Sequence, residues 1–186
     1  MLPPLPTELL HTLFKEHIAS GDLVIDATAG NGFDTLFLAE AVGLSGKVIA
    51  IDIQEKAISV TTKRLEEAGF LDRASLHLGS HTDICEIADG GVPSAIIFNL
   101  GYLPGGDRAL ITRTEQTLPA LAAAVEILRP GGCLAVICYP GHLGGDAEAI
   151  AVENFISSAR NLRTARYGLI ANGSPAPFLL LSCKES

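Results

Sequence analysis

A short segment near the N-terminus combines two glycines with acidic and hydroxyl side chains, residue types that can together hold a cofactor. It reads Asp-Ala-Thr-Ala-Gly-Asn-Gly-Phe-Asp-Thr over residues 26–35. The glycines allow a tight turn and a close approach of ligand to backbone, and a helix that follows the turn presents free N–H groups. We therefore expect cofactor contacts from Asp26, Thr28, Gly30, Asn31, Gly32, Asp34 and Thr35.

The acidic residue in this segment argues against a dinucleotide. The third glycine of a dinucleotide-binding fingerprint would fall at position 35, where Thr35 stands, and Asp34 lies where a pyrophosphate would bind. A carboxylate near a helix N-terminus suits a cationic ligand, such as the amino group or the sulfonium of S-adenosylmethionine. Asp34 can equally cap the helix. The sequence leaves both roles open.

Two further segments extend the expected cofactor site. Asp52 lies 20 residues beyond Gly32 at the end of the second apolar run, where a carboxylate can accept hydrogen bonds from both hydroxyls of a ribose. Gln54 extends that contact. Ser80 and His81 follow the third run, where an adenine would lie, although Ser80 can also cap a helix and His81 can be a surface residue.

Apolar runs of strand length alternate with amphipathic segments of helix length. Strands are predicted over 23–25, 47–51, 73–78, 94–98 and 133–139, and helices over 7–19 (with Thr7 as N-cap), 34–42, 55–68, 146–160 and after Ser80 or Thr82. A helix that ends at Leu128 begins at Thr112 or near Thr117, because Pro119 would interrupt the longer version.

The order of these elements indicates an α/β fold. Strands joined by crossover helices form a mostly parallel sheet with helices on both faces, and ligands bind beyond the carboxyl ends of the strands. The last two apolar runs, 164–171 and 178–183, are too close for a crossover helix and are expected to pair antiparallel.

Composition limits the class of protein. The 186 residues fit one domain, 1–186; 48% are apolar and 18% charged, and no apolar run approaches the roughly 18 residues needed to span a bilayer. No export signal is visible, so we expect a cytoplasmic protein without membrane contact. The four cysteines form no Cys-x-x-Cys pair and are predicted to be buried reduced thiols, with no metal site.

The net charge of −8 is unevenly distributed. Residues 1–93 hold 6 Lys/Arg against 14 Asp/Glu, whereas residues 94–186 hold 7 of each. An anionic partner is therefore expected to avoid the first half. A net negative charge argues against strong non-specific binding to nucleic acid, because such binding requires many contacts between basic side chains and phosphates. A local basic patch is still compatible with this composition.

Several motifs together resemble the bacterial tRNA wobble-uridine methyltransferases, a family also known as rRNA methylases. The motifs are 26–35, Ile51-Asp-Ile-Gln54, Ser80-His81, Asn99-Leu-Gly-Tyr-Leu-Pro-Gly-Gly-Asp107, Thr114-Glu-Gln-Thr-Leu118 and Tyr139-Pro-Gly-His142. The resemblance implies a class I S-adenosylmethionine-dependent enzyme: a Rossmann-like three-layer sandwich with a mostly parallel seven-stranded sheet and an antiparallel C-terminal hairpin. It also implies methylation of the exocyclic amine of 5-aminomethyl-2-thiouridine.

The loop after the fourth predicted strand is the expected reaction site. The Asn99 side chain can accept a hydrogen bond from the amine, as can the backbone carbonyls from Leu100 through Gly101 to Tyr102. Asn99 is also expected to border the cofactor, and the Tyr102 ring can stack on the base. Asp107 or His142 is expected to take the proton. The predicted catalytic residues are Asn99, Tyr102, Asp107 and His142, and the predicted substrate contacts are Leu100, Gly101, Tyr102, Arg108, Arg113 and Tyr139.

The expected partner is the anticodon region of tRNA, whose phosphates Arg108 and Arg113 would contact beside the glycine-rich loop. The sequence leaves a homodimer open. Other functions stay as alternatives: a methyltransferase for rRNA or for a small-molecule amine, an NAD-dependent oxidoreductase, and a nucleotide-binding module without catalysis. The missing third glycine disfavours the oxidoreductase, and the complete segment from Asn99 to Asp107 disfavours the inactive module.

Overall fold

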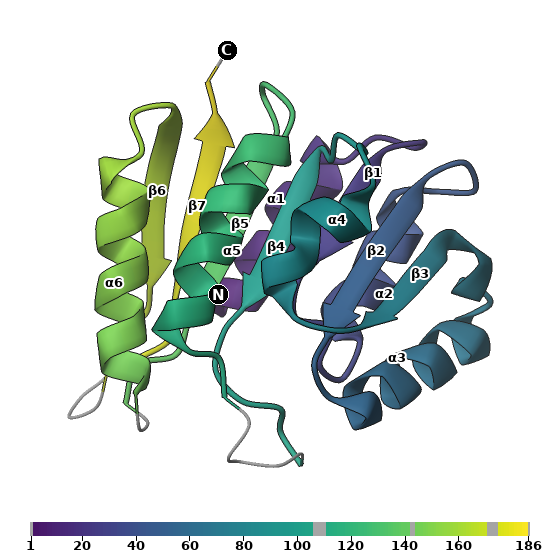
Figure 1. The fold of residues 1–186 in the computed structure, drawn as a ribbon, viewed down its shortest axis with the longest axis horizontal. Helices are drawn as coiled ribbons and strands as arrows, with labels where there is room; N and C mark the ends of the chain where they lie inside the picture. The colour runs from purple at the N-terminus through teal and green to yellow at the C-terminus, as the bar shows by residue number, and fades with distance from the viewer. Residues whose placement is uncertain (1, 106–110, 142–143, 171–174, 186) are drawn as a thin grey trace.

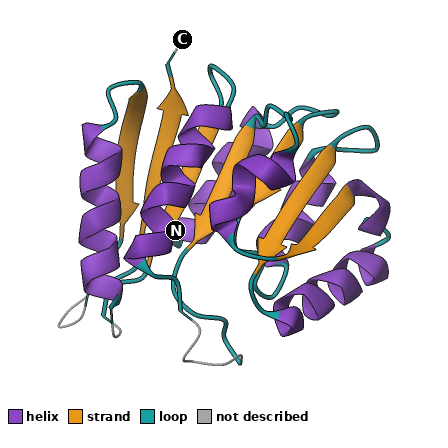
Figure 2. Cartoon of the chain, viewed as in Figure 1, coloured by secondary structure: helices purple, strands orange, loops and turns teal. Residues whose placement is uncertain are grey.

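A seven-stranded sheet organises the part of the chain that the computed structural model describes, residues 2–105, 111–141, 144–170 and 175–185 (Figures 1 and 2). The strand order is β3-β2-β1-β4-β5-β7-β6. The strands from β1 to β5 pair in parallel, and β7 is antiparallel to both of its neighbours. The strands are β1 (Leu23–Asp26), β2 (Lys47–Asp52), β3 (Ala74–Leu78), β4 (Ala95–Asn99), β5 (Cys133–Cys138), β6 (Leu162–Gly168) and β7 (Phe178–Lys184).

Helices cover both faces of this sheet. Figure 1 shows α4 and α5 in front of the sheet and α1 behind it. The helices are α1 (Pro6–His17), α2 (Phe33–Ala41), α3 (Glu55–Ala68), α4 (Ile84–Ala88), α5 (Thr114–Ile127) and α6 (Gly145–Ser158), with single 3₁₀ turns at Leu71–Arg73 and His81–Asp83. The predicted α/β fold, with its parallel sheet and its antiparallel C-terminal pair, is confirmed.

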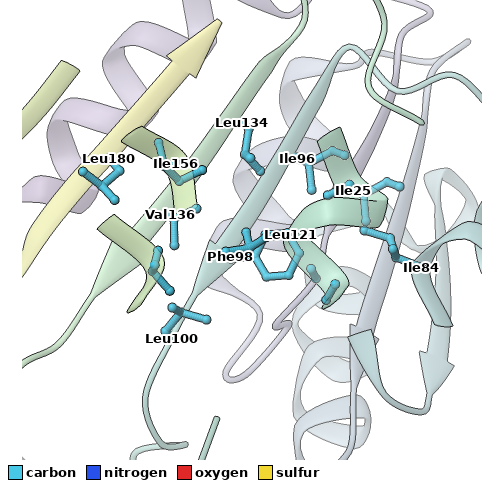
Figure 3. Packing of buried hydrophobic residues seen from close by; sticks show 14 of the residues in the cluster. Ile25, Ile84, Ile96, Phe98, Leu100, Leu121, Leu134, Val136, Ile156 and Leu180 are labelled. Carbon is cyan, nitrogen blue, oxygen red and sulfur yellow. The ribbon is translucent and has the colours of Figure 1, made fainter. Parts of the chain in front are cut away.

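Alternating residues of the central strands feed two separate cores. On β4, Ile96 and Phe98 pack with Leu121 of α5 (Figure 3), whereas Ile97 packs on the opposite face with Phe14 of α1. Because both faces are covered, the central strands read as continuous apolar runs rather than as an apolar and polar alternation. Cys133 and Cys138 of β5 also belong to opposite cores, as their spacing predicts.

The start of the first helix differs from the prediction. Helix α1 begins at Pro6 with Leu5 at the N-cap, so Thr7 lies inside the helix rather than capping it. Proline favours the first helical position because its fixed φ suits the helix and its missing N–H would have had no partner. The Leu5 backbone N–H instead donates to the Glu8 carboxylate over 2.8 Å.

Helix α5 begins at Thr114, between the two predicted starts, and carries Pro119 in its interior. From the sequence, Pro119 argues against the longer helix, because proline cannot donate a hydrogen bond to the preceding turn and its ring crowds that turn.

One cysteine also departs from expectation: Cys85 is exposed, whereas Cys133 and Cys138 are buried and Cys183 is partly buried. None of the helices in the described ranges is long and apolar enough to cross a membrane.

The connection from β1 to α2 depends on a glycine at the N-cap of α2. Gly32 has a φ of +76°, and a Cβ atom there would lie 2.9 Å from the Thr61 Cα atom of α3. Gly69, at the C-cap of α3, has a similar φ of +73° but open space around the corresponding position. The two glycines therefore separate the effect of backbone conformation from the effect of packing.

We predict that Gly69→Ala lowers the free energy of unfolding by about 1 kcal/mol, the cost of the left-handed conformation alone. Gly32→Ala should lower it by about 2–4 kcal/mol, because the methyl group must also displace α3. Urea denaturation of the two variants and the parent measures both values. Equal losses at the two positions would contradict the close approach of α3 to the turn.

Candidate active site

A cavity of about 310 Å³ opens at the carboxyl ends of β1, β2 and β4, at the point in the sheet where the strand order reverses: β2 and β3 lie on one side of β1, and β4 and β5 lie on the other. This size suits a small organic ligand. The cavity brings together most of the predicted site residues: Thr28, Gly30, Asn31, Asp34, Asp52, Gln54, His81, Asn99, Leu100, Gly101, Tyr102 and Tyr139.

The other predicted contacts lie around the cavity or outside the described residues. Gly32 packs on α3, Ser80 caps the 3₁₀ turn by accepting from the Thr82 N–H over 3.2 Å, and Arg113 is exposed at the N-cap of α5. Asp26 and Thr35 are fully buried beneath the turn. Asp107, Arg108 and His142 are not among the described residues.

The buried carboxyl of Asp26 supports the turn from below. It accepts from the Thr35 hydroxyl over 2.6 Å and from the Thr28 N–H over 3.2 Å. Complete burial raises the pKa of Asp26 to about 7, and the neighbouring charge of Asp34 also raises it. A strand-end aspartate in a glycine-rich segment looks like a ligand contact in the sequence, but its depth makes it part of the scaffold.

Asp52 holds the same turn from the side and still faces the cavity. Its Oδ2 atom accepts from the Gly30 N–H and its Oδ1 atom accepts from the Gln54 N–H, each over 2.9 Å. Burial raises the pKa of this carboxyl. Each carboxylate oxygen has a second lone pair, so a pair of adjacent hydroxyls on a ligand can be bound here.

His81 presents a buried nitrogen without a partner at another wall of the cavity. The residue is 7% exposed, and its ring packs edge-on against Phe98 with the ring centroids 5.7 Å apart. Within the described residues, its Nε2 atom has no hydrogen-bond partner. Burial lowers the pKa of the imidazole, which favours the neutral ring. An unpaired buried nitrogen of this kind is suited to a hydrogen bond with a polar ligand.

The segment after β4 lies across the turn. The Asn31 side-chain amide donates to the Pro104 carbonyl over 3.4 Å, Lys56 donates to the Gly105 carbonyl, and the Leu103 side chain packs close to Gly30. These contacts join two loops that are far apart in the sequence, and they form one wall of the cavity.

The same segment is fixed at its other end by a buried acid that the sequence reasoning missed. Glu148 of α6 is 4% exposed and accepts from the hydroxyls of Thr112 and Thr117, both over 2.6 Å. The Thr112 hydroxyl oxygen in turn accepts from the Gly101 N–H over 2.8 Å. An acidic residue on the inner, apolar face of a predicted helix is the signal that could have drawn attention to Glu148.

Asp34 and Asn99 both line the cavity and contact each other, and His11 of α1 contacts Asp34. Asp34 lies 2.6 Å from His11 Nε2 through Oδ1 and accepts from Asn99 Nδ2 through Oδ2 over 2.9 Å. Gly32, not Asp34, stands at the N-cap of α2, and in the described part of the chain the Asp34 carboxylate bonds to side chains, those of His11 and Asn99. The capping role left open by the sequence is therefore not the one adopted, and His11 is a second residue that the motifs did not indicate.

Tyr139 completes this group. Burial raises the pKa of its hydroxyl, as does the charge of Asp34, while a side-chain hydrogen bond with Asn99 lowers it. Since Nδ2 donates to Asp34, the Asn99 carbonyl oxygen can accept from a ligand.

The chain is similar to proteins described as methylases. A family model described as putative rRNA methylase matches residues 48–182. A chloroplastic tRNA (mnm(5)s(2)U34)-methyltransferase of Arabidopsis thaliana is 42% identical over 158 residues, which are 80% of this chain and 58% of that relative. The chain therefore spans little more than half of that protein's length.

Two solved structures resemble almost the whole chain. One is from Clostridium thermocellum, described as a putative rRNA-methylase, with a TM-score of 0.91, 36% identity and coverage of 99% of this chain and 100% of that one. The other is a putative methyltransferase from Streptococcus mutans in complex with SAH, with a TM-score of 0.85, 34% identity and coverage of 98% and 99%.

We predict that Asp26→Asn changes how stability depends on pH. The raised pKa means that the folded protein keeps a proton which the unfolded chain has released between about pH 4 and pH 7. The stability that this proton provides is complete below that window and is lost as the pH rises through it. Since an asparagine side chain does not ionise, the variant should gain stability relative to the parent across the window, with a slope of at most about 1.4 kcal/mol per pH unit.

Urea denaturation at several pH values from 4 to 8 measures this difference. Asp72→Asn, at an exposed position in the 3₁₀ turn before β3, controls for the loss of one acidic group. A difference between Asp26→Asn and the parent that stays constant across the window would contradict the ionisation of a buried Asp26.

Proposed function

The chain belongs to the family described as putative rRNA methylase, and from this premise we propose that it methylates the aminomethyl nitrogen of 5-aminomethyl-2-thiouridine at the wobble position of tRNA. It is an S-adenosylmethionine-dependent methyltransferase with the class I fold. The observation that carries the choice of substrate is the 42% identity, over 80% of this chain, to a tRNA methyltransferase named for that nucleoside.

The residues of the cavity fit the cofactor. The Asp52 carboxylate can accept from both ribose hydroxyls, His81 Nε2 can pair with the adenine, and Gly30 lets the ligand approach the backbone. When bound, S-adenosylmethionine supplies a methyl group on a positively charged sulfur. The chain itself provides alignment, which can contribute roughly 7–11 kcal/mol to lowering the barrier of a transfer reaction.

The group at Asn99 can orient the acceptor nitrogen. The Asn99 carbonyl oxygen accepts a hydrogen bond from the amine, because the amide nitrogen of the same side chain donates to Asp34. An alkylamine has a pKa near ~10 and must lose a proton before it reacts. Asp107 and His142 remain the predicted acceptors of that proton.

The RNA would approach the cavity along the segment after β4. Tyr102 lines the cavity and is 48% exposed, and its ring is proposed to stack on the uracil. Arg113 is exposed nearby at the start of α5 and is proposed to contact a phosphate, together with Arg108. The anticodon region as docking site, a homodimer and a cytoplasmic location stay predictions.

Methylation of rRNA is the second candidate, favoured by the description of the family model. One assay separates the two. The purified protein is incubated with S-adenosylmethionine and with either ribosomal RNA or tRNA that carries 5-aminomethyl-2-thiouridine, and the nucleosides are analysed by mass spectrometry. We expect one methyl group on the wobble nucleoside of the tRNA and none on ribosomal RNA.

Asn99→Ala should reduce the single-turnover rate on this tRNA by about 100-fold, as the loss of one oriented polar contact does in other active sites. Asn161→Ala, an exposed position before β6, serves as the matched control and should keep the parental rate. Methyl transfer to ribosomal RNA alone would refute the proposed substrate. A parental rate in Asn99→Ala would refute the proposed role of Asn99.

A further inference from the structure

His11 joins the active site from a helix that otherwise lies outside it. Its ring stacks on Phe37 of α2, with centroids 4.1 Å apart and an angle of 7° between the planes. This packing aims the Nε2 atom at Asp34 Oδ1, 2.6 Å away. The His11 side chain is 31% exposed and that of Asp34 is 9% exposed, so the contact joins the surface to the interior of the cavity.

The contact continues from Asp34 to Asn99. An ionised carboxylate can only accept hydrogen bonds, so its second oxygen fixes the Asn99 side chain with Nδ2 toward Asp34. The Asn99 backbone N–H donates to the Thr28 hydroxyl over 2.7 Å, which holds the main chain in place. The orientation of the amide, and thus the position of its carbonyl oxygen, is then set by Asp34.

The surroundings of Asp34 explain why a donor is needed there. The charge of Asp34 raises the pKa of the Asp26 carboxyl at the end of β1 and the pKa of the Tyr139 phenol after β5. His11 Nε2 contacts the Oδ1 atom of the Asp34 carboxylate over 2.6 Å. His11 thus adds a favourable partner, besides the Asn99 amide, for a carboxylate that also faces an acid and a phenol.

We propose that His11 is a positioning residue for methyl transfer: it holds the Asp34 carboxylate, which orients Asn99 so that its carbonyl oxygen accepts from an amino group at the transfer position. The inference rests on the proposed function in one respect, since it requires an amine at that position. It does not depend on which RNA carries the amine.

Two inhibitors test the acceptor without any RNA. S-adenosylhomocysteine has no group at the transfer position, whereas sinefungin carries an amino group on carbon there. Isothermal titration of both gives a preference ratio for each variant. We expect the parent to prefer sinefungin. In His11→Phe, which keeps a ring to stack on Phe37, the preference should fall about tenfold, while the Kd for S-adenosylhomocysteine changes less than about threefold.

Two more variants complete the test. His11→Gln should keep part of the preference, because its amide N–H can still donate to Asp34. His17→Phe, on the same helix but with its Nε2 atom 3.2 Å from the Ser94 carbonyl, should leave the ratio unchanged. Single-turnover rates on the tRNA substrate should fall in the same order as the preference for sinefungin.

An unaltered ratio in His11→Phe overturns the proposal, as does a parent without preference for sinefungin. An equal loss of both inhibitors also overturns it, because it would assign His11 a purely structural role. If the parent methylates no tRNA but His11→Phe still loses the preference, the proposed substrate fails while the positioning role of His11 stands.

Discussion

Backbone N–H groups of the turn between β1 and α2 bind two strand-end carboxylates, and the active site depends on this constraint. The Asp26 carboxyl accepts a hydrogen bond from the Thr28 N–H below the turn, and the Asp52 carboxylate accepts one from the Gly30 N–H beside it. A glycine-rich turn has many accessible conformations, so these bonds select one of them. The selected conformation leaves the Asp52 carboxylate at the cavity and brings Asp34 to the cavity wall.

A second set of polar contacts fixes the opposite wall. Glu148 holds Thr112, and Thr112 holds Gly101, so the segment after β4 is tied to α6 as well as to the sheet. Buried polar networks of this kind are expensive when incomplete, because each unpaired group retains its desolvation cost. Since methyl transfer needs alignment above all, a cavity with both walls fixed is well suited to the proposed reaction.

The sequence predicted the fold and the outline of the site because both depend on local patterns. Apolar runs and glycines placed the strands and the turn, and the position of Asp52 after β2 identified a residue that does face the cavity. Depth and long-range pairing were not accessible in the same way. Asp26 has the spacing of a ligand contact but lies beneath the turn, and Glu148 and His11 reach the site from helices whose sequence carries no motif for it.

A crystal structure of the protein with S-adenosylhomocysteine tests most directly whether Asp52 and Asn99 bind the cofactor. We expect both ribose hydroxyls of the ligand to donate to the Asp52 carboxylate and its sulfur to face Asn99. A ligand bound at another surface, or one whose ribose lies away from Asp52, would contradict this expectation.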